Sequence, residues 1–289
     1  MAAPNSPFSL ADSTPRSSKT TINIAGFHVH LYGVDELTAE QRNDTTVVFH
    51  VHGRTRTYAD AEDLSHTVLS ELRKQPTKQT KGVVFATFDN RNHGTRAIDT
   101  ISIADWRGGN PRHAQDMLST MDGIVADLQT TMKFLHGYVV GQFVPTQYIV
   151  TGTSLGGHVA WDLLARDPRV DVAVIIVGCP ALTPLLQERV DAFLGEPAPA
   201  QRTCAKEWPA AIERLYQERD AEVATVAGKT ILILNGAVDA LVPSKFTRAW
   251  LERHGASNDV AFVEQADTGH ALTVAMVERI VAFLPQFLA

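Results

Sequence analysis

The chain has 289 residues and a formal net charge of −6, with 44% hydrophobic and 20% charged residues. This composition is typical of a globular protein that can bury a large core without metals or disulfides. The acidic balance argues against a surface for nucleic acid, and no apolar run approaches the ~20 residues that a bilayer requires. We therefore expect neither nucleic acid nor a membrane as a partner.

Residues 1–18 are rich in Ser, Pro and Thr and lack the apolar segment of a secretory signal. We interpret them as a disordered leader and expect a cytoplasmic location. Cys179 and Cys204 fit neither a disulfide framework nor a zinc-binding pattern, so we expect both to be free thiols.

Strand and helix patterns alternate along the rest of the chain. Continuous apolar runs that alternate with helices are typical of a mostly parallel sheet covered on both faces, so the predicted fold class is α/β. We predict strands at 20–24, 27–32, 45–51, 82–88, 148–151, 170–177, 230–234 and 260–263, and helices at 58–74, 114–136, 155–166, 245–254 and 272–284.

Residues 181–229 interrupt this alternation. They contain amphipathic stretches and a Pro- and Gly-rich segment but no strand pattern. A structureless loop of this length would be unusual in a compact domain. We therefore predict a helical cap inserted into one domain that spans residues 19–289.

The motif Gly152-Thr153-Ser154-Leu155-Gly156-Gly157 lies directly between a predicted strand and a predicted helix. A nucleophilic serine needs a sharp turn there, and the tight backbone favours glycine two residues before and two after it. The alternative is a glycine-rich loop with a solvated serine. The strand before the motif and the helix after it favour Ser154 as a nucleophile.

Asp239 and His270 each follow a predicted strand, at the edge of the sheet where ligands of α/β proteins bind. A serine nucleophile needs a base and a third group that orients the base. We predict His270 as the base and Asp239 as the orienting acid. Glu264 and Asp267 are the alternative acids, and Cys179 would be a rival nucleophile only with an oriented base of its own.

With these motifs, the sequence resembles the α/β-hydrolase superfamily, whose triad runs Ser, Asp or Glu, then His. The resemblance implies an oxyanion hole formed by the backbone N–H groups of Leu155 and Arg54, the latter from a His52-Gly53 loop. It implies no cofactor. The turn that starts at Asp89, together with Trp106, resembles largely uncharacterised fungal α/β-hydrolases.

The expected activity is that of a serine carboxylesterase acting on a small to medium ester or lactone through an acyl-enzyme on Ser154. Amidase, thioesterase and acyltransferase activities use the same triad and stay open. A ligand-binding protein with this fold and no turnover is the alternative from another class. Oligomeric state is not predicted.

Trp106 and Arg91 are candidate substrate contacts, and the alternative for Trp106 is that it anchors a long loop. Arginines of the expected site loops either hold an anionic substrate or pair with neighbouring acids and brace the loops. The arginines are Arg54, Arg56, Arg91, Arg96, Arg107 and Arg112, and the acids are Asp60, Asp89, Asp105 and Asp116.

Paired histidines, His50 with His52 and His28 with His30, share a strand face and could suggest a metal. No carboxylate or cysteine stands at a further ligand spacing, so we predict no metal site. We expect His52 to brace the loop at Gly53 by hydrogen bonding.

Overall fold

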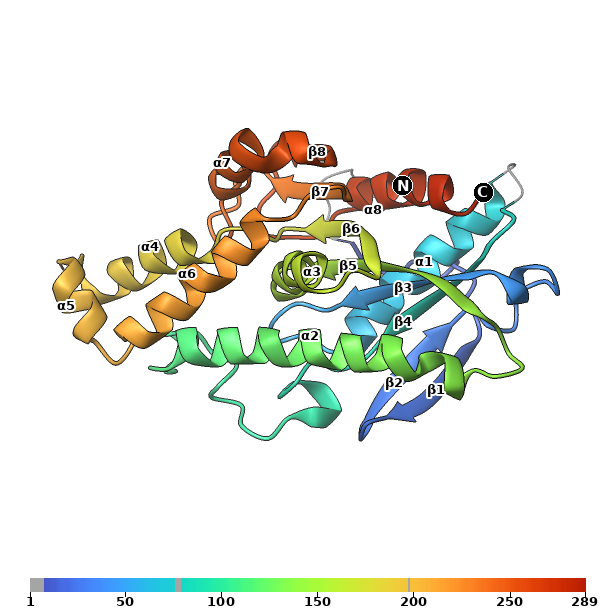
Figure 1. Cartoon of the computed structure of the whole chain (residues 1–289), viewed down its shortest axis with the longest axis horizontal. Coiled ribbons are helices and arrows are strands. Elements are labelled where there is room, and N and C mark those ends of the chain that lie inside the picture. Colours follow the sequence, from blue (N-terminus) through green and yellow to red (C-terminus); the bar gives the residue numbers. More distant parts are fainter. Residues whose placement is uncertain (1–7, 76–78, 197) are drawn as a thin grey trace.

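The computed structural model describes residues 8–75, 79–196 and 198–289, which fold around one central sheet (Figure 1). Eight strands of the described chain lie in the order β1-β2-β4-β3-β5-β6-β7-β8. The strands are β1 Lys19–Ile24, β2 Phe27–Tyr32, β3 Thr45–Val51, β4 Gly82–Thr87, β5 Pro145–Thr153, β6 Val170–Ile176, β7 Thr230–Gly236 and β8 Asp259–Gln265. β1 pairs antiparallel with β2, and β2 with β4, whereas every other pair is parallel.

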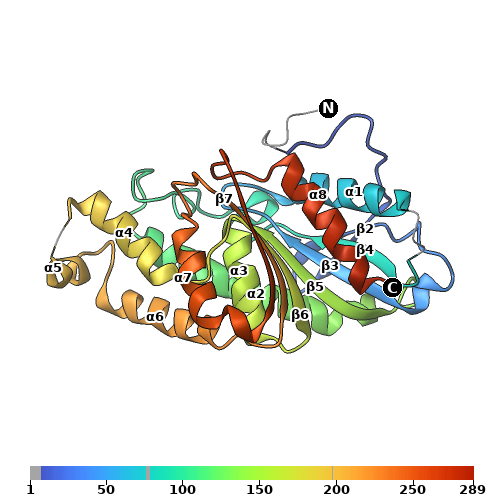
Figure 2. The same cartoon turned by 90° about the horizontal axis from the view of Figure 1, so that it is seen from above.

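Helices cover both faces of this sheet (Figure 2). The helices are α1 Tyr58–Lys74, α2 His113–Tyr138, α3 Leu155–Arg166, α4 Leu182–Leu194, α5 Pro199–Cys204, α6 Ala210–Ala224, α7 Lys245–His254 and α8 Val274–Phe283. α2 and α3 lie on one face, and α1 and α8 lie on the other (Figure 1). The predicted α/β fold class is confirmed. No helix of the described chain is both long and apolar enough to cross a membrane.

Successive side chains of each strand point to opposite faces and supply two hydrophobic cores. Val47 and Phe49 of β3 join the core that contains α2 and α3, whereas Val48 joins the core with α1 and α8. All three side chains are at most 1% exposed. Burial on both faces explains why the parallel strands appear in the sequence as continuous apolar runs.

Several predicted boundaries match the structure, including those of α1, α3, α7, β2 and β3. The last helix begins at Val274 rather than at Leu272. The hydroxyl of Thr273 accepts a hydrogen bond from the backbone N–H of Met276 at 3.3 Å, so Thr273 caps the helix and sets its start.

The segment between β6 and β7 forms α4, α5 and α6. α4 and α5 extend beyond the end of the sheet (Figures 1 and 2), whereas α6 packs against α3. The carboxylate of Asp220 on α6 accepts the backbone N–H groups of Leu182 and Thr183 at 2.9 and 2.8 Å. A side chain of α6 therefore caps the start of α4, where the preceding residue, Ala181, has no polar group to do so.

The predicted leader falls partly outside the described residues, which begin at Phe8. Residues 8–18 contain no helix or strand. However, the N–H of Phe8 donates to the carbonyl of Leu272 at 2.8 Å, and the N–H of Ser17 donates to Nδ1 of His66 at 3.0 Å. These contacts hold this part of the leader against the domain, in contrast to the disorder we predicted for it.

Candidate active site

Ser154 lies in a sharp turn between β5 and α3, with φ +57° and ψ −112°. A Cβ at Gly152 would lie 2.0 Å from the carbonyl oxygen of Gly156, and a Cβ at Gly156 would lie 2.0 Å from that of Val51. Only glycine fits either position, because the backbone segments almost touch. This is the geometry that exposes a nucleophilic serine above the sheet.

The surrounding backbone holds Ser154 in this strained conformation. Its N–H donates to the carbonyl of Ile176 on β6 at 2.8 Å, and its own carbonyl accepts the N–H of His158 at 3.0 Å. A non-glycine residue with positive φ costs on the order of 1–3 kcal/mol, so it persists where neighbouring structure fixes it.

The structure brings together the three residues that were predicted as a triad. Nε2 of His270 lies 2.8 Å from Oγ of Ser154, and Nδ1 of His270 lies 2.7 Å from Oδ2 of Asp239. The other oxygen of Asp239 accepts the N–H groups of Leu241 and Val242, both at 2.8 Å. The side chain of Asp239 is fully buried, whereas that of His270 is 22% exposed. This arrangement orients the imidazole so that it can take a proton from Ser154.

The alternative residues are engaged elsewhere. The carboxylate of Glu264 accepts hydrogen bonds from Ser244 and Arg248, and Asp267 is exposed. Cys179 is buried, its thiol donates to the carbonyl of Ala181 at 3.2 Å, and burial raises the thiol pKa to about 12. Cys179 is therefore a protonated thiol, which is a poor nucleophile.

Two backbone segments flank the hydroxyl of Ser154. Leu155 is the first residue of α3, and the first N–H groups of a helix have no partner within it. On the other side, a Cβ at Gly53 would lie 3.5 Å from Cβ of Ser154, so the Gly53-Arg54 backbone adjoins the serine. The predicted oxyanion donors, Leu155 and Arg54, thus belong to backbone segments that adjoin Ser154.

His52 fixes this loop, as expected. Nδ1 of His52 lies 2.8 Å from the carbonyl oxygen of Gly53, and Nε2 accepts the backbone N–H of Asn90 at 2.9 Å. Burial lowers the pKa of His52 to about 4, so the ring is neutral and can accept through one nitrogen while it donates through the other.

The other paired histidines form no metal cluster. Nδ1 of His50 lies 2.5 Å from the hydroxyl of Thr151, and Nδ1 of His30 lies 2.8 Å from that of Thr21. Within residues 8–75, 79–196 and 198–289, no group of three or more His, Cys, Asp or Glu side chains is arranged to hold a metal ion.

Two pockets meet beside the triad. The first pocket, of about 390 Å³, is lined by Ser154 and His270. The second pocket, of about 330 Å³, is lined by Trp106, His113, Phe193 and Arg189, with part of α4 as a wall. Arg54 and Leu241 line both, so the pockets adjoin.

The structure corrects the prediction for Arg91. Its Nε and Nη2 donate to the two carboxylate oxygens of Asp127 on α2 at 3.1 and 2.8 Å, and Arg91 lines neither pocket. Arg96 also pairs with Asp127, at 2.8 Å. These two arginines brace the loop, whereas Trp106 lines the second pocket.

Sequence analysis did not identify Arg189 as a pocket residue. On α4, Leu182, Leu185, Leu186 and Val190 are buried at helical spacing, and Arg189 lies on the same stripe. A charged residue within an apolar stripe was the signal that could have identified it.

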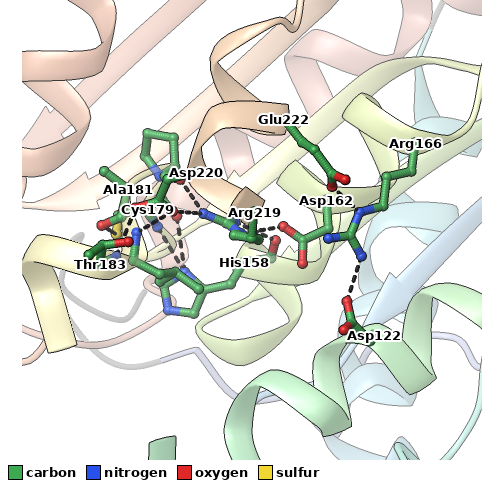
Figure 3. A network of polar contacts seen from close by, with 12 residues as sticks. Asp122, His158, Asp162, Arg166, Cys179, Ala181, Thr183, Arg219, Asp220 and Glu222 are labelled. Carbon is green, nitrogen blue, oxygen red and sulfur yellow. Dashed lines mark hydrogen bonds and ion pairs between the residues drawn. The ribbon is translucent and has the colours of Figure 1, made fainter. Parts of the chain in front are cut away.

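A separate polar cluster, here called the Arg219 cluster, lies between α6 and α3 (Figure 3). Nε of Arg219 lies 2.6 Å from Asp162, and Nη1 lies 2.9 Å from Asp220. The guanidinium also donates to the carbonyls of Pro180 and of His158, the latter at 3.3 Å. The side chains of Arg219 and Asp162 are at most 1% exposed. The cluster fixes the inserted helices to α3, the helix that follows Ser154.

Comparisons with known proteins agree with this geometry. The model of a family described as alpha/beta hydrolase matches residues 47–283. The crystal structure of TT1662 from Thermus thermophilus is 19% identical over 95% of this chain and 99% of its own, with a TM-score of 0.62. The Pyrococcus furiosus esterase Pf2001 is 17% identical over 99% of this chain and 100% of its own, with a TM-score of 0.58.

A third similar structure is Est1E from Butyrivibrio proteoclasticus with ferulic acid bound. It is 15% identical over 93% of this chain and 97% of its own, with a TM-score of 0.57. No curated protein matches the sequence significantly. At these identities, the solved structures show a shared fold and carry no information on substrate.

Proposed function

This chain belongs to the alpha/beta hydrolase family, and on that premise we propose that it is a serine carboxylesterase that cleaves small to medium esters or lactones. The observation that carries the proposal is the continuous chain of contacts from Ser154 through His270 to Asp239, with distances of 2.8 and 2.7 Å. One of the similar structures, Pf2001 from Pyrococcus furiosus, is named as an esterase, which is consistent with ester hydrolysis.

The geometry supports the following reaction. Nε2 of His270 takes the proton of Ser154 as Oγ forms a bond to the ester carbonyl carbon, and the carbonyl oxygen becomes negative. The N–H groups of Leu155 and Arg54 donate to that oxygen. The bond to the alcohol then breaks, and His270 returns the proton to the leaving alkoxide. A water molecule repeats the sequence and releases the acid.

The first test replaces the nucleophile. Ser154→Ala should lower ester hydrolysis by a factor on the order of 10⁴ to 10⁶, because the base and the acid then have nothing to activate. The rates are measured with p-nitrophenyl esters of increasing chain length, beside amides, thioesters and lactones. A fluorophosphonate should label wild-type Ser154 in mass spectrometry, and a label on Cys179 or on another serine would contradict the assignment.

The second test concerns the acid. Asp239→Asn should lower kcat by roughly 10⁴-fold, because the amide cannot hold the His270 tautomer that accepts the serine proton. Glu264→Gln and Asp267→Asn are the matched controls and should each change kcat less than about threefold, since neither carboxylate contacts His270. A comparable loss of kcat in Asp267→Asn would show that Asp239 is not the residue that orients His270.

A further inference from the structure

Two residues in the wall of the second pocket, Arg189 and Trp106, each contain a hydrogen-bond donor that no described residue accepts. Nε of Arg189 and Nε1 of Trp106 are buried, and neither has a hydrogen-bond partner among the described residues. Both residues line this pocket. Both atoms are covered by other protein atoms, so the class of ligand follows from the charge of the pocket and not from these two donors.

The charge of the second pocket favours an anionic ligand. Arg54 and Arg189 line it together, and the positive charge of Arg54 helps burial to lower the pKa of Arg189. Among the described residues, Arg189 forms no ion pair, and its one hydrogen bond goes to the carbonyl of Leu241. Arg54 donates to the carbonyl of Ile103 at 2.7 Å and lies 3.9 Å from the carboxylate of Asp105.

The acids at the pocket do not neutralise these guanidinium groups. Asp105 is 44% exposed and only approaches Arg54. Glu188 is half exposed, and its two oxygens accept from Lys245 at 2.7 Å. His113 adds no charge of its own, because burial together with Arg54 and Arg189 lowers its pKa to about 3. The pocket is therefore cationic.

From this excess of positive charge, we infer that the second pocket binds a carboxylate on the substrate, so that the enzyme acts on esters that carry a second, free carboxylate group. Arg189 and Arg54 hold this carboxylate. Arginine is the side chain best suited to a carboxylate, because its planar group can donate two parallel hydrogen bonds.

The position of the pocket defines the substrate further. Because Arg54 and Leu241 line both pockets, we expect only a short linker in the substrate between its free carboxylate and the ester carbonyl at Ser154. This inference rests on the proposed esterase function. Monoesters of short dicarboxylic acids have this layout, with the carboxylate on the acyl side, and acylated hydroxy acids have it on the alcohol side.

The kinetic test compares matched substrates. The p-nitrophenyl monoesters of succinic, glutaric and adipic acid are measured against neutral p-nitrophenyl esters of equal chain length, and acetoxy acids test the alcohol side. In wild type, kcat/KM should favour an anionic ester, and Arg189→Gln should lower the ratio of anionic to neutral rates by about tenfold to a hundredfold. Arg189→Lys should restore part of this ratio.

Arg91→Gln is the matched control, because Arg91 pairs with Asp127 and lines neither pocket. In Arg91→Gln, the ratio of kcat/KM for anionic and neutral esters should equal that of wild type. If Arg189→Gln changes anionic and neutral rates equally, then Arg189 only braces the loop at Leu241 and the inference is wrong.

A binding experiment separates this inference from the proposed function. Glutarate is titrated calorimetrically into Ser154→Ala, with neutral glutaramide as the control ligand. Glutarate should bind, glutaramide should not, and Ser154→Ala with Arg189→Gln should lose glutarate binding. If glutarate binds but the wild-type protein hydrolyses no ester, the carboxylate site is supported and the esterase function is wrong. If the wild-type protein hydrolyses esters but glutarate does not bind, the proposed carboxylate site is wrong.

Discussion

The inserted segment contains two arginines with opposite surroundings, Arg219, which is buried, and Arg189, which is partly buried. Arg219 on α6 has carboxylates on two sides, Asp162 at 2.6 Å and Asp220 at 2.9 Å. Arg189 on α4 has no ion pair within the described parts of the chain, and its Nε has no hydrogen-bond partner there. One guanidinium is neutralised by the protein itself, and the other is open to a pocket.

The contrast shows how burial of the same group can serve two purposes. A buried guanidinium needs compensation, since moving a charge out of water costs several kcal/mol. When the chain supplies that compensation, the arginine joins helices, as Arg219 joins α6 to α3. When the chain supplies no carboxylate, the free protein keeps the cost of the unpaired charge, and a ligand of opposite charge removes that cost when it binds.

The sharpest test of this contrast is the same substitution at both positions. Arg219→Leu should lower the free energy of unfolding by about 3–5 kcal/mol, because it leaves the carboxylate of Asp162 buried without a partner. Arg189→Leu should change it by less than about 1 kcal/mol, because the lost hydrogen bond to Leu241 is offset by removal of an unpaired, partly buried charge. Urea unfolding of both variants provides the measurement.

A double variant serves as the control for that experiment. Arg219→Leu combined with Asp162→Leu removes both charges and should recover about 2 kcal/mol or more of the loss. Asp220 stays compensated in this variant, because it also accepts the N–H groups of Leu182 and Thr183. No recovery would mean that Arg219 stabilises the fold through packing rather than through the ion pair.

Acid pH should lower the free energy of unfolding by a smaller amount, through two histidines that lie near these arginines, His113 and His158. Burial and the neighbouring arginines lower the pKa of His113 to about 3 and that of His158 well below its usual value. Both rings stay neutral in the folded state, whereas the unfolded chain binds protons below about pH 6.5. Their stabilising contribution is therefore complete above pH 6.5 and is lost as pH falls toward the folded pKa, by up to about 1.4 kcal/mol per pH unit for each ring.

The measurement is the slope of the unfolding free energy between pH 6 and pH 4.5. His113→Gln should reduce that slope by about one proton relative to wild type. An unchanged slope would show that His113 takes up a proton in the folded protein, which would contradict a cationic second pocket.

The sequence was informative where the pattern is local. The turn around Ser154 could be predicted because the backbone contacts at Gly152 and Gly156 are too close for any side chain, so the sequence must have glycine there. Asp239 and His270 could be placed because each follows an apolar strand, and the carboxyl ends of parallel strands meet at one edge.

The sequence was uninformative where a partner is distant. Arg91 was assigned to the substrate, since nothing near it in sequence shows that Asp127, 36 residues later, will neutralise it. Arg189 was missed for the opposite reason, because the lack of a partner depends on how α4 packs against α6 beyond the end of the sheet. The interactions of Phe8 and Ser17 likewise depend on tertiary neighbours that composition does not encode.

The two cysteines of the sequence differ in a way that offers a spectroscopic probe. Cys179 is buried, and burial raises its pKa to about 12, whereas Cys204 is exposed on α5. A maleimide fluorophore applied to the native protein should therefore attach at Cys204 alone. Because Arg202 of α5 pairs with Asp191 of α4 at 2.7 Å, the dye would be tied to the wall of the second pocket. Its emission would report ligand-dependent movement of α4 without any engineered residue.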